Sequence, residues 1–327
     1  MKKILITGGC GFIGSNLVKA LLKNEKDLII YILDALTYAA NLDNFSPEEW
    51  NNSRLKFTKG NIRDEDLVIS LFKKVDLVIH LAAETHVDRS IAEAYPFVET
   101  DVVGTQVLLE SIRQIPIERF IHISTSEVYG KAITAPMDES HPLNPQSPYA
   151  AAKAGADRLA YAYFITYDLP ITIIRPFNNY GPYQFSEKLI PLFITNALEG
   201  ISLPVYGQGI FTRDWLHVSD HCRALEKLIH IDLKAIKGEV INLGTGREWD
   251  VNYIATAIIN RLGKSKGLIK NVTDRPGHVQ RHMASTTKAK DILGWEAEIK
   301  FEEGLLETID WYRENEDWWK NIKGRKD

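Results

Sequence analysis

Short apolar runs alternate with longer amphipathic stretches in the first half of this chain. The apolar runs have the length and composition of buried strands, and they occupy residues 3–7, 28–33, 55–59, 76–81, 120–124 and 171–175. Between them, helical spacing of apolar positions covers residues 15–22, a stretch up to about 73, 96–115 and 147–168. Such alternation predicts an α/β fold with a Rossmann-type, doubly wound parallel sheet.

Proline and glycine interrupt the shorter elements of the second half. Helical patterns occupy residues 220–231, 251–262 and 301–316. Residues 239–243 have the pattern of a strand that returns to the main sheet. We therefore expect residues 1–175 to form the sheet domain, with a returning segment near 210–245. Residues 176–327 should form mainly a smaller C-terminal substrate-binding cap.

A glycine-rich turn follows the first predicted strand. Gly9, Gly11 and Gly14 have the spacing G-x-G-x-x-G between a strand and a helix, as a dinucleotide-binding motif requires. The second strand ends at Asp34, about 20 residues further on, where a carboxylate binds the ribose hydroxyls of a dinucleotide. Because this carboxylate would repel a 2′-phosphate, the motif predicts NAD rather than NADP.

A tyrosine and a lysine lie four residues apart at the start of a predicted helix. Ser147 and Pro148 have the character of an N-cap and a first helical residue, which places Tyr149 and Lys153 on one helix face. The ammonium group, and a cationic cofactor nearby, should favour the phenolate and lower the pKa of Tyr149 from its reference value near 10. Alone, such a pair is usually ordinary helix surface. Together with the dinucleotide motif it indicates a catalytic base.

Ligands of a doubly wound sheet bind at the carboxyl ends of its strands. Two further polar segments follow predicted strands directly: residues 82–86 and residues 125–127. We expect both to lie beside the glycine turn and to form one site with it.

Composition and charge exclude several kinds of partner. The chain is 45% apolar and 25% charged, with a net charge of -4 and no basic tract, so we expect neither nucleic acid nor anionic membrane as a partner. No run of about 18 apolar residues predicts a membrane span, and we expect no signal peptide. Cys10 and Cys222 are far apart, which argues against a disulfide or a metal site and for the cytoplasm.

Longer motifs extend over nearly the whole chain. They read DALTYAANLDN (34–44), HLAAETHVDRSI (80–91), STSEVYG (124–130), NPQSPYAAAKAGAD (144–157), RPFNNYGPYQFSEKLIPLFI (175–194), RDWLHVSDHCRA (213–224) and DRPGHVQRH (274–282). In these motifs the chain resembles the extended short-chain dehydrogenases/reductases that act on nucleotide sugars. Within that superfamily it most resembles the dTDP-glucose 4,6-dehydratases. The resemblance implies a homodimer through a four-helix bundle, built here from helices near residues 97–114 and 147–168.

The resemblance also implies roles for individual residues. The catalytic set would be Thr125, Ser126, Glu127, Tyr149 and Lys153. NAD would contact Gly8, Gly11, Phe12, Ile13, Gly14, Asp34, Ala35, Leu36, Thr37, Asn61, Ile62, Leu81, Ala82, Ala83, Thr100, Tyr149, Lys153 and Asn179. A nucleotide-diphosphate sugar would contact Thr85, Thr125, Asn178, Lys188, Leu189, Pro204, Tyr206, Arg213, Asn242, Arg275 and His278.

The implied reaction is an internal redox cycle on the sugar. Tyr149 would take the proton of the 4-hydroxyl while hydride leaves C4 for NAD, with Lys153 on the nicotinamide ribose and Thr125 on the C4 oxygen. A 4-ketone acidifies the C5 proton, so Glu127 could remove it as a base. Water would leave across C5–C6, and the hydride would return to C6.

One residue departs from the dehydratase pattern at the catalytic position. Ser126 stands where dTDP-glucose 4,6-dehydratases have the aspartate that protonates the departing hydroxyl, and a serine is a poor general acid. Thr-Ser-Glu is also typical of GDP-mannose 4,6-dehydratases and of UDP-glucuronate decarboxylases. A second departure is Asn61, where the dehydratases have an aspartate near the adenine, and we expect a modest effect on cofactor affinity.

Three hypotheses therefore remain open at the level of sequence. Asn179 and Tyr183 favour a dehydratase over a decarboxylase, and Asp34 argues against the NADP-using GDP-mannose group. A UDP-glucuronate decarboxylase or a nucleotide-sugar 4-epimerase could use the same oxidation at C4. An NAD-binding protein without chemistry would be the natural hypothesis only if Tyr149, Lys153 or Glu127 were missing.

Overall fold

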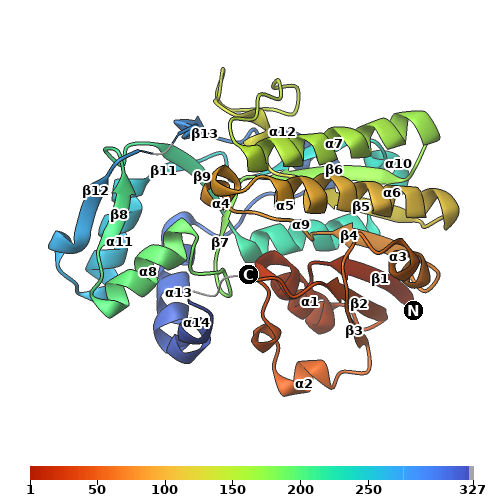
Figure 1. Cartoon of the computed structure of the whole chain (residues 1–327), viewed down its shortest axis with the longest axis horizontal. Coiled ribbons are helices and arrows are strands. Elements are labelled where there is room, and N and C mark those ends of the chain that lie inside the picture. Colours follow the sequence, from red (N-terminus) through yellow and green to blue (C-terminus); the bar gives the residue numbers. More distant parts are fainter. Residues whose placement is uncertain (275, 324–327) are drawn as a thin grey trace.

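Seven parallel strands form the centre of the molecule in the computed structural model, which describes residues 1–274 and 276–323 (Figure 1). They are β1 (Lys2–Thr7), β2 (Leu28–Asp34), β3 (Leu55–Lys59), β4 (Leu77–His80), β5 (Arg119–Ile123), β6 (Ile171–Pro176) and β10 (Val240–Leu243). The order across the sheet is β10-β6-β5-β4-β1-β2-β3. This confirms the doubly wound sheet, including the returning strand β10, which pairs with β6.

The strand order reverses between β1 and β4. These two strands are neighbours in the sheet, and the chain continues from them to opposite edges. The loops after their carboxyl ends therefore separate and leave a crevice between them. The glycine turn follows β1 and residues 81–83 follow β4, so both segments border that crevice.

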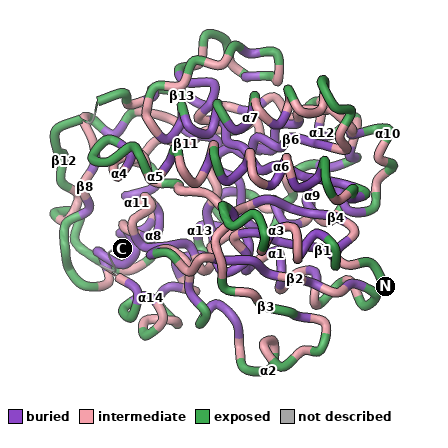
Figure 2. Tube along the Cα trace, turned by 45° about the vertical axis from the view of Figure 1, so that its right-hand side comes forward, coloured by how far each residue is buried: buried purple, intermediate pink, exposed green. Residues whose placement is uncertain are grey.

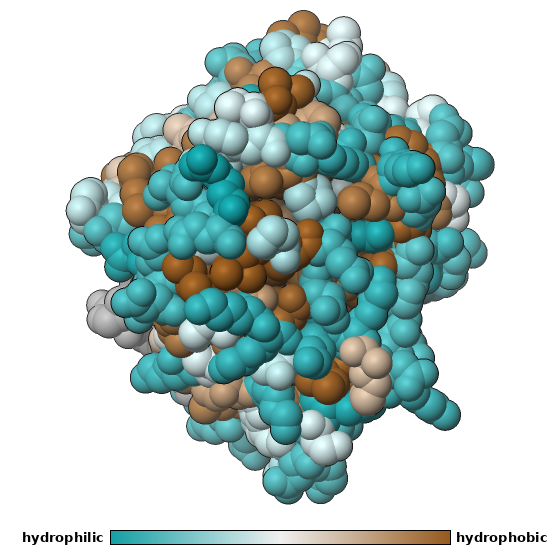
Figure 3. All heavy atoms as spheres, turned by 90° about the vertical axis from the view of Figure 1, so that its right-hand side faces the viewer, coloured by the Kyte–Doolittle hydropathy of each residue, from teal (hydrophilic) through white to brown (hydrophobic). Residues whose placement is uncertain are grey.

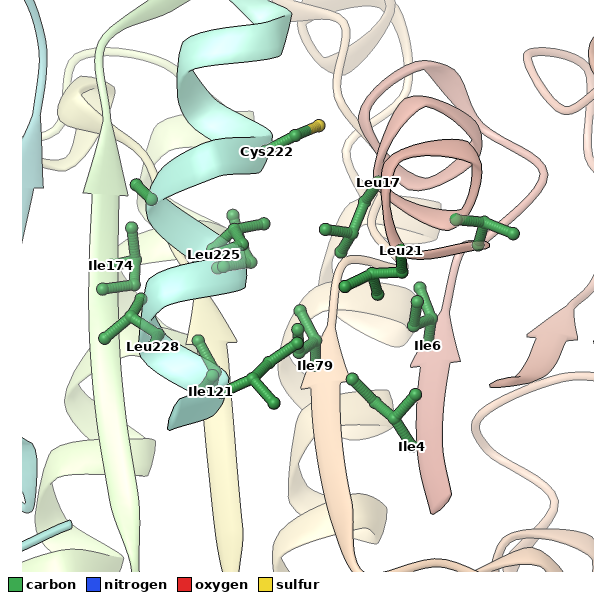
Figure 4. Close-up of a cluster of buried hydrophobic side chains, with 14 of the residues drawn as sticks. Ile4, Ile6, Leu17, Leu21, Ile79, Ile121, Ile174, Cys222, Leu225 and Leu228 are labelled. Carbon is green, nitrogen blue, oxygen red and sulfur yellow. The ribbon is translucent and has the colours of Figure 1, made fainter. Parts of the chain in front are cut away.

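Helices cover both faces of the sheet, as Figure 1 shows. One face carries α1 (Phe12–Asn24) and α9 (Val218–His230), and the other carries α3 (Glu65–Phe72), α6 (Thr105–Gln114) and α7 (Pro148–Tyr167). In Figure 4, Leu21 of α1 and Leu225 of α9 point toward the strand residues Ile79 and Ile121. Burial of these branched side chains holds the two helices on the sheet.

The start of α7 follows the pattern that the sequence predicted. The Ser147 hydroxyl accepts a hydrogen bond from the backbone N–H of Ala150 at 3.1 Å, and Pro148 is the first helical residue. Asp168 ends the helix in a left-handed backbone conformation. This cap decides which residues lie in the first turns, and these include Tyr149 and Lys153.

The helix predicted over residues 96–115 consists of three consecutive parts. They are α5 (Tyr95–Phe97), the π-helical segment η2 (Val98–Gly104) and α6. π-Helical turns inside helices are frequent at functional sites. Here the segment carries Thr100 and the buried residue Asp101.

The cap has its own strands, helices and apolar core. The strands are β7 (Asn178–Tyr180), β8 (Leu203–Tyr206), β9 (Thr212–His217), β11 (Glu248–Asp250), β12 (Ile269–Val272) and β13 (Arg281–His282). The helices are α8 (Leu189–Glu199), α11 (Val251–Leu262), α13 (Phe301–Glu314) and α14 (Glu316–Ile322). Trp319 is fully buried in this core, and Trp311 and Trp318 pack against it. These three tryptophans therefore pack within the chain.

Shorter elements connect the main ones. They are η1 (Leu42–Asn44), α2 (Pro47–Trp50), α4 (Val87–Ala92), η3 (Ser126–Tyr129), α10 (Leu233–Ile236), η4 (Lys266–Leu268) and α12 (Thr287–Leu293). Figure 2 shows buried residues along the central strands and exposed residues in the outer loops. On the face shown in Figure 3, hydrophilic residues surround smaller groups of apolar ones.

Over residues 1–274 and 276–323 no helix is both long and apolar enough to cross a membrane. The same residues contain no cluster of histidine, cysteine or acidic side chains that could hold a metal ion. Cys10 and Cys222 are both buried free thiols.

Candidate active site

A cavity of about 480 Å³ lies between the carboxyl ends of the central strands and the cap. Most of the predicted site residues line it. They are Gly8, Gly11, Phe12, Ile13, Gly14, Asp34, Ala35, Thr37, Asn61, Ile62, Leu81, Ala82, Ala83, Thr85, Thr100, Thr125, Ser126, Glu127, Tyr149, Lys153, Asn178, Asn179, Lys188, Leu189, Pro204, Tyr206, Arg213 and His278. The fold thus brings segments from both halves of the chain to one place.

The glycine turn leaves no room for side chains. Gly8 has a φ of +71°, and a Cβ on it would lie 2.7 Å from the backbone N of Ala82. A Cβ on Gly14 would lie 2.2 Å from the carbonyl oxygen of Gly8. Gly11 is the N-cap of α1 and has no side chain to occupy the first backbone N–H groups of that helix. Bare backbone at a helix N-terminus is the arrangement that binds a pyrophosphate.

Asp34 is held rigidly beside this turn. Its carboxylate accepts hydrogen bonds from the backbone N–H groups of Cys10 and Leu36, each at 2.8 Å. Burial raises the pKa of Asp34, and these two hydrogen bonds oppose the shift. Leu36 has a left-handed backbone with a φ of 56° and does not line the cavity. Its backbone N–H group orients Asp34. Leu36 was predicted to contact NAD, but it is not one of the residues that line the cavity.

Tyr149 and Lys153 both face the cavity from α7, as their spacing predicted. The Lys153 Nζ donates a hydrogen bond to the carbonyl oxygen of Ile123 at 2.8 Å. Burial lowers the pKa of Lys153 below its ordinary value. The strand β5 therefore holds the ammonium group in place at the cavity.

The expectation of a lowered pKa for Tyr149 is wrong for the chain's own groups. Burial raises this pKa most, and the carboxylates of Asp101 and Glu127 raise it further. A hydrogen bond with Thr125 acts in the opposite direction but does not offset burial. Since desolvation penalises the charged phenolate, the phenol needs an additional positive charge before it can act as a base.

Thr125, Ser126 and Glu127 enter the cavity from η3, directly after β5. Thr125 is the N-cap of η3, and its hydroxyl accepts a hydrogen bond from the backbone N–H of Glu127 at 3.2 Å. Ser126 is buried, whereas the Glu127 side chain is 20% exposed. The carboxylate available for proton transfer in this triplet is that of Glu127.

Basic and hydrogen-bonding side chains line the cap side of the cavity. The Lys188 Nζ donates a hydrogen bond to the carbonyl oxygen of Thr85 at 2.6 Å. Arg213 is buried and donates to the carbonyl oxygen of Val279 at 2.6 Å. His278 Nδ1 lies 2.6 Å from the Asp274 carboxylate. The cationic side chains of Lys188 and Arg213, held in this way, can bind a diphosphate.

One predicted substrate contact, Asn242, does not line the cavity. Asn242 is fully buried, and its side chain accepts a hydrogen bond from the Tyr129 hydroxyl at 2.7 Å and donates to the Met137 carbonyl at 3.1 Å. Its amide therefore serves the interior rather than a ligand. Arg275 lies outside the described residues.

Several residues at or beside the cavity were not singled out from the sequence. The Tyr38 hydroxyl donates to Glu187 Oε1 at 2.8 Å, and His86 Nδ1 lies 3.9 Å from Glu187 Oε2. Asp101 packs behind the cavity, where burial raises its pKa to about 7. Glu187 precedes Lys188 in the motif of residues 175–194, and this position could have indicated that Glu187 lies at the site. Asp101 had no such signal.

A bare glycine turn, a buried carboxylate at the end of β2 and a Tyr-Lys pair meet at one cavity, and together they define the class of protein. The chain is an extended short-chain dehydrogenase/reductase. It belongs to the GDP-mannose 4,6 dehydratase family, whose model matches residues 5–308.

The most similar proteins point to one branch of this family. A dTDP-glucose 4,6-dehydratase of Streptomyces niveus is 45% identical over 98% of this chain and 96% of its own length. The crystal structure of DesIV, a dTDP-glucose 4,6-dehydratase of Streptomyces venezuelae with NAD bound, has a TM-score of 0.94. It is 43% identical and covers 98% of this chain and 100% of its own. A UDP-glucuronic acid 4-epimerase of Bacillus cereus is less similar, at 32% identity over 95% and 99% of the two chains and a TM-score of 0.89.

Proposed function

We propose that this chain is an NAD-dependent nucleotide-sugar 4,6-dehydratase whose substrate is dTDP-glucose. The observation that carries the proposal is the convergence of Tyr149, Lys153 and Glu127 on one cavity with the glycine turn and Asp34. The identity of about 45% to a dTDP-glucose 4,6-dehydratase over nearly the full length supports this substrate over others.

The residues of the chain fit NAD. The glycine turn and the N-terminus of α1 would hold the pyrophosphate, and Asp34 would bind the adenosine ribose hydroxyls. Lys153 would hold the nicotinamide ribose. When bound, NAD accepts hydride from C4, returns it to C6, and places a positive charge beside the Tyr149 phenol.

The first chemical task of the protein is to take a proton from the 4-hydroxyl. Tyr149 is the base for this step, and Thr125 holds the C4 oxygen toward it. Lys153, bonded to the Ile123 carbonyl, keeps its ammonium group in a fixed position during the transfer.

The second task is elimination of water across C5–C6. Glu127 removes the C5 proton, which the 4-ketone has made acidic. Ser126 cannot donate a proton to O6 as a carboxylic acid would. In this chain the leaving hydroxyl must therefore receive its proton from Glu127 or from a water molecule that the Ser126 hydroxyl orients.

The cap would bind the nucleotide diphosphate. Lys188, Arg213 and His278 supply cationic or hydrogen-bonding groups on that side of the cavity. We propose residues 1–175 as the NAD-binding domain and residues 176–327 as mainly the substrate-binding cap. The two free thiols support a cytoplasmic location.

Product analysis by mass spectrometry tests the proposed function. The protein would be incubated with NAD and, separately, with dTDP-glucose, UDP-glucose, GDP-mannose and UDP-glucuronate. We expect dTDP-glucose to lose one water. Loss of carbon dioxide from UDP-glucuronate would identify a decarboxylase instead, and a new isomer of unchanged mass would identify an epimerase. An unchanged panel with retained NAD would indicate a binding protein.

We also propose that two chains associate through the helices of residues 95–114 and α7. These helices cover the sheet with one side and still expose large apolar side chains: Val98 is 46%, Val103 43% and Ile165 61% exposed. Apolar residues exposed in this way on neighbouring helices favour burial against a second copy.

Replacing Ile165 by glutamate should convert the dimer into monomers. A charge placed at the centre of an apolar contact must be desolvated when the contact forms, which costs more than the contact stabilises. Analytical ultracentrifugation at micromolar concentration measures the result. The matched control is Ile133→Glu, at a position that is 71% exposed and outside these helices. If both variants sediment like the wild-type dimer, α7 does not form the interface.

A further inference from the structure

His282 lies beside the triplet of residues 125–127, and the proposed mechanism assigns it no role. It belongs to β13 in the cap and is fully buried. Its Nε2 lies 2.6 Å from the carbonyl oxygen of Gly130. Its Nδ1 lies 3.9 Å from Oε1 of Glu127. Within the described part of the chain this Nδ1 has no hydrogen-bond partner.

The Gly130 carbonyl decides the tautomer of His282. A carbonyl oxygen only accepts hydrogen bonds, so Nε2 must carry the hydrogen. The neutral ring therefore presents the lone pair of Nδ1 toward the Glu127 carboxyl group. A lone pair facing an ionised carboxylate is unfavourable, whereas one proton between the two groups stabilises both.

The other charged groups around His282 do not compete for that proton. Arg213 is its neighbour across the pairing of β13 with β9, and His141 approaches from the loop that follows η3. Burial lowers the pKa of His282 most, Glu127 raises it, and Arg213 and His141 lower it. Glu127 in turn faces Tyr149 on the cavity side. Of the side chains that act on the pKa of His282, Glu127 is the one with a carboxyl group, so it is the one that can share a proton with the ring.

We propose that His282 is a positioning residue that shares a proton with Glu127, so that one carboxyl group can act as base toward C5 and as acid toward O6. The proposal rests on the proposed dehydration. It answers the difficulty that Ser126 creates, because the residue before Glu127 cannot supply the proton that O6 needs. While the two residues share the proton, Nδ1 of His282 holds the Glu127 carboxyl group in one orientation. That orientation is kept between the proton transfer from C5 and the proton transfer to O6.

The elimination balances with these two residues. Glu127 takes the C5 proton, and the electron pair of the C5–H bond becomes the π bond between C5 and C6. The C6–O6 bond breaks with its electron pair on oxygen, O6 receives the proton from Glu127, and water leaves. Glu127 is again a carboxylate, and His282 is unchanged.

Two substitutions separate this role from a structural one. In His282→Gln the side-chain amide can still donate to the Gly130 carbonyl, but no acceptor remains at the Nδ1 position. In His282→Asn an amide remains near the Nδ1 position, but the contact with Gly130 is lost. We expect His282→Gln to fold with an unchanged Tm and to lose about 10- to 100-fold in kcat, less than the ~10²- to 10⁴-fold of direct proton transfer.

A second background makes the kinetic test specific. Ser126→Asp supplies a separate acid for O6, so in that background His282→Gln should change kcat by no more than about three-fold. The same loss in both backgrounds would overturn the proposal. The proposal would also be overturned if His282→Gln were fully active and His282→Asn inactive. That result would mean that the ring serves only to bind the Gly130 carbonyl.

A titration that needs no substrate distinguishes this proposal from the proposed function. The pKa of His282 would be measured by ¹⁵N NMR in the wild type and in Glu127→Gln, with His282→Gln identifying the signal. Loss of the shared proton should lower the pKa by about one pH unit or more. An unchanged pKa would overturn the proposal. The pKa of His282 could differ between the wild type and Glu127→Gln even though the protein fails to dehydrate dTDP-glucose. That result would support the His282–Glu127 pair and reject only the proposed function.

Discussion

Replacing Tyr149 by phenylalanine should lower kcat about 10²- to 10⁴-fold, the usual contribution of a general base. In the proposed mechanism the phenol oxygen takes the proton of the 4-hydroxyl, and it shares a hydrogen bond with Thr125. Phenylalanine keeps the ring in its edge contact with Phe97, at 6.2 Å between centroids. The loss should therefore appear in catalysis and not in folding.

Steady-state kinetics with dTDP-glucose and NAD measures this effect, and thermal unfolding verifies the fold. Tyr253→Phe is the control, since Tyr253 is 43% exposed on α11 and does not line the cavity. Its kcat should equal that of the wild type. A Tyr149→Phe variant that keeps wild-type kcat would show that another group takes the proton.

Replacing Asp157 by asparagine should cost about 3–5 kcal/mol of stability, because it leaves a buried guanidinium without its counterion. Asp157 and Arg175 side chains are 0% and 2% exposed. Two guanidinium nitrogens donate to the two carboxylate oxygens at 2.9 Å, and a third donates to the Tyr129 hydroxyl at 2.9 Å. This pair fixes α7 to β6 behind the cavity.

The pair also makes stability depend on pH. Burial alone would raise the pKa of Asp157, but the hydrogen bonds and charge of Arg175 hold it well below its ordinary value of 3.8. A depressed folded-state pKa stabilises the fold above the unfolded-state value and loses that effect as the pH falls below it. The wild type should therefore lose stability below pH about 4, and Asp157→Asn should lose less over the same range.

Urea unfolding at neutral pH and at pH about 3 measures both effects. Asp310→Asn is the control, because it breaks the partly exposed pair with Arg261, whose side chains are 28% and 41% exposed. Such a pair contributes about 1 kcal/mol or less. Equal destabilisation by the two substitutions would contradict the assignment of Asp157 as a buried counterion.

Much of the cofactor half of the site was readable from the sequence because it depends on local geometry. The strand, the glycine turn and the helix that follow one another from Lys2 to Asn24 need only residue size and spacing. The same holds for Asp34 at the end of β2 and for the capped start of α7, which places Tyr149 and Lys153 on one face. The sequence also showed that Ser126, in the motif of residues 124–130, replaces the aspartate of the dTDP-glucose 4,6-dehydratases.

The contacts between distant segments had no such local signal. His282 approaches Glu127 only because β13 pairs with β9 beneath η3, and Asn242 turns away from the cavity because Tyr129 and Met137 satisfy its amide. The chain's own groups raise the pKa of Tyr149 because burial depends on everything packed around the phenol, and a four-residue spacing does not report that burial. The sequence by itself therefore determined which chemical groups the chain brings to the sheet edge. Only the tertiary structure decided which of them are desolvated and which share protons, because both properties depend on segments far apart along the chain.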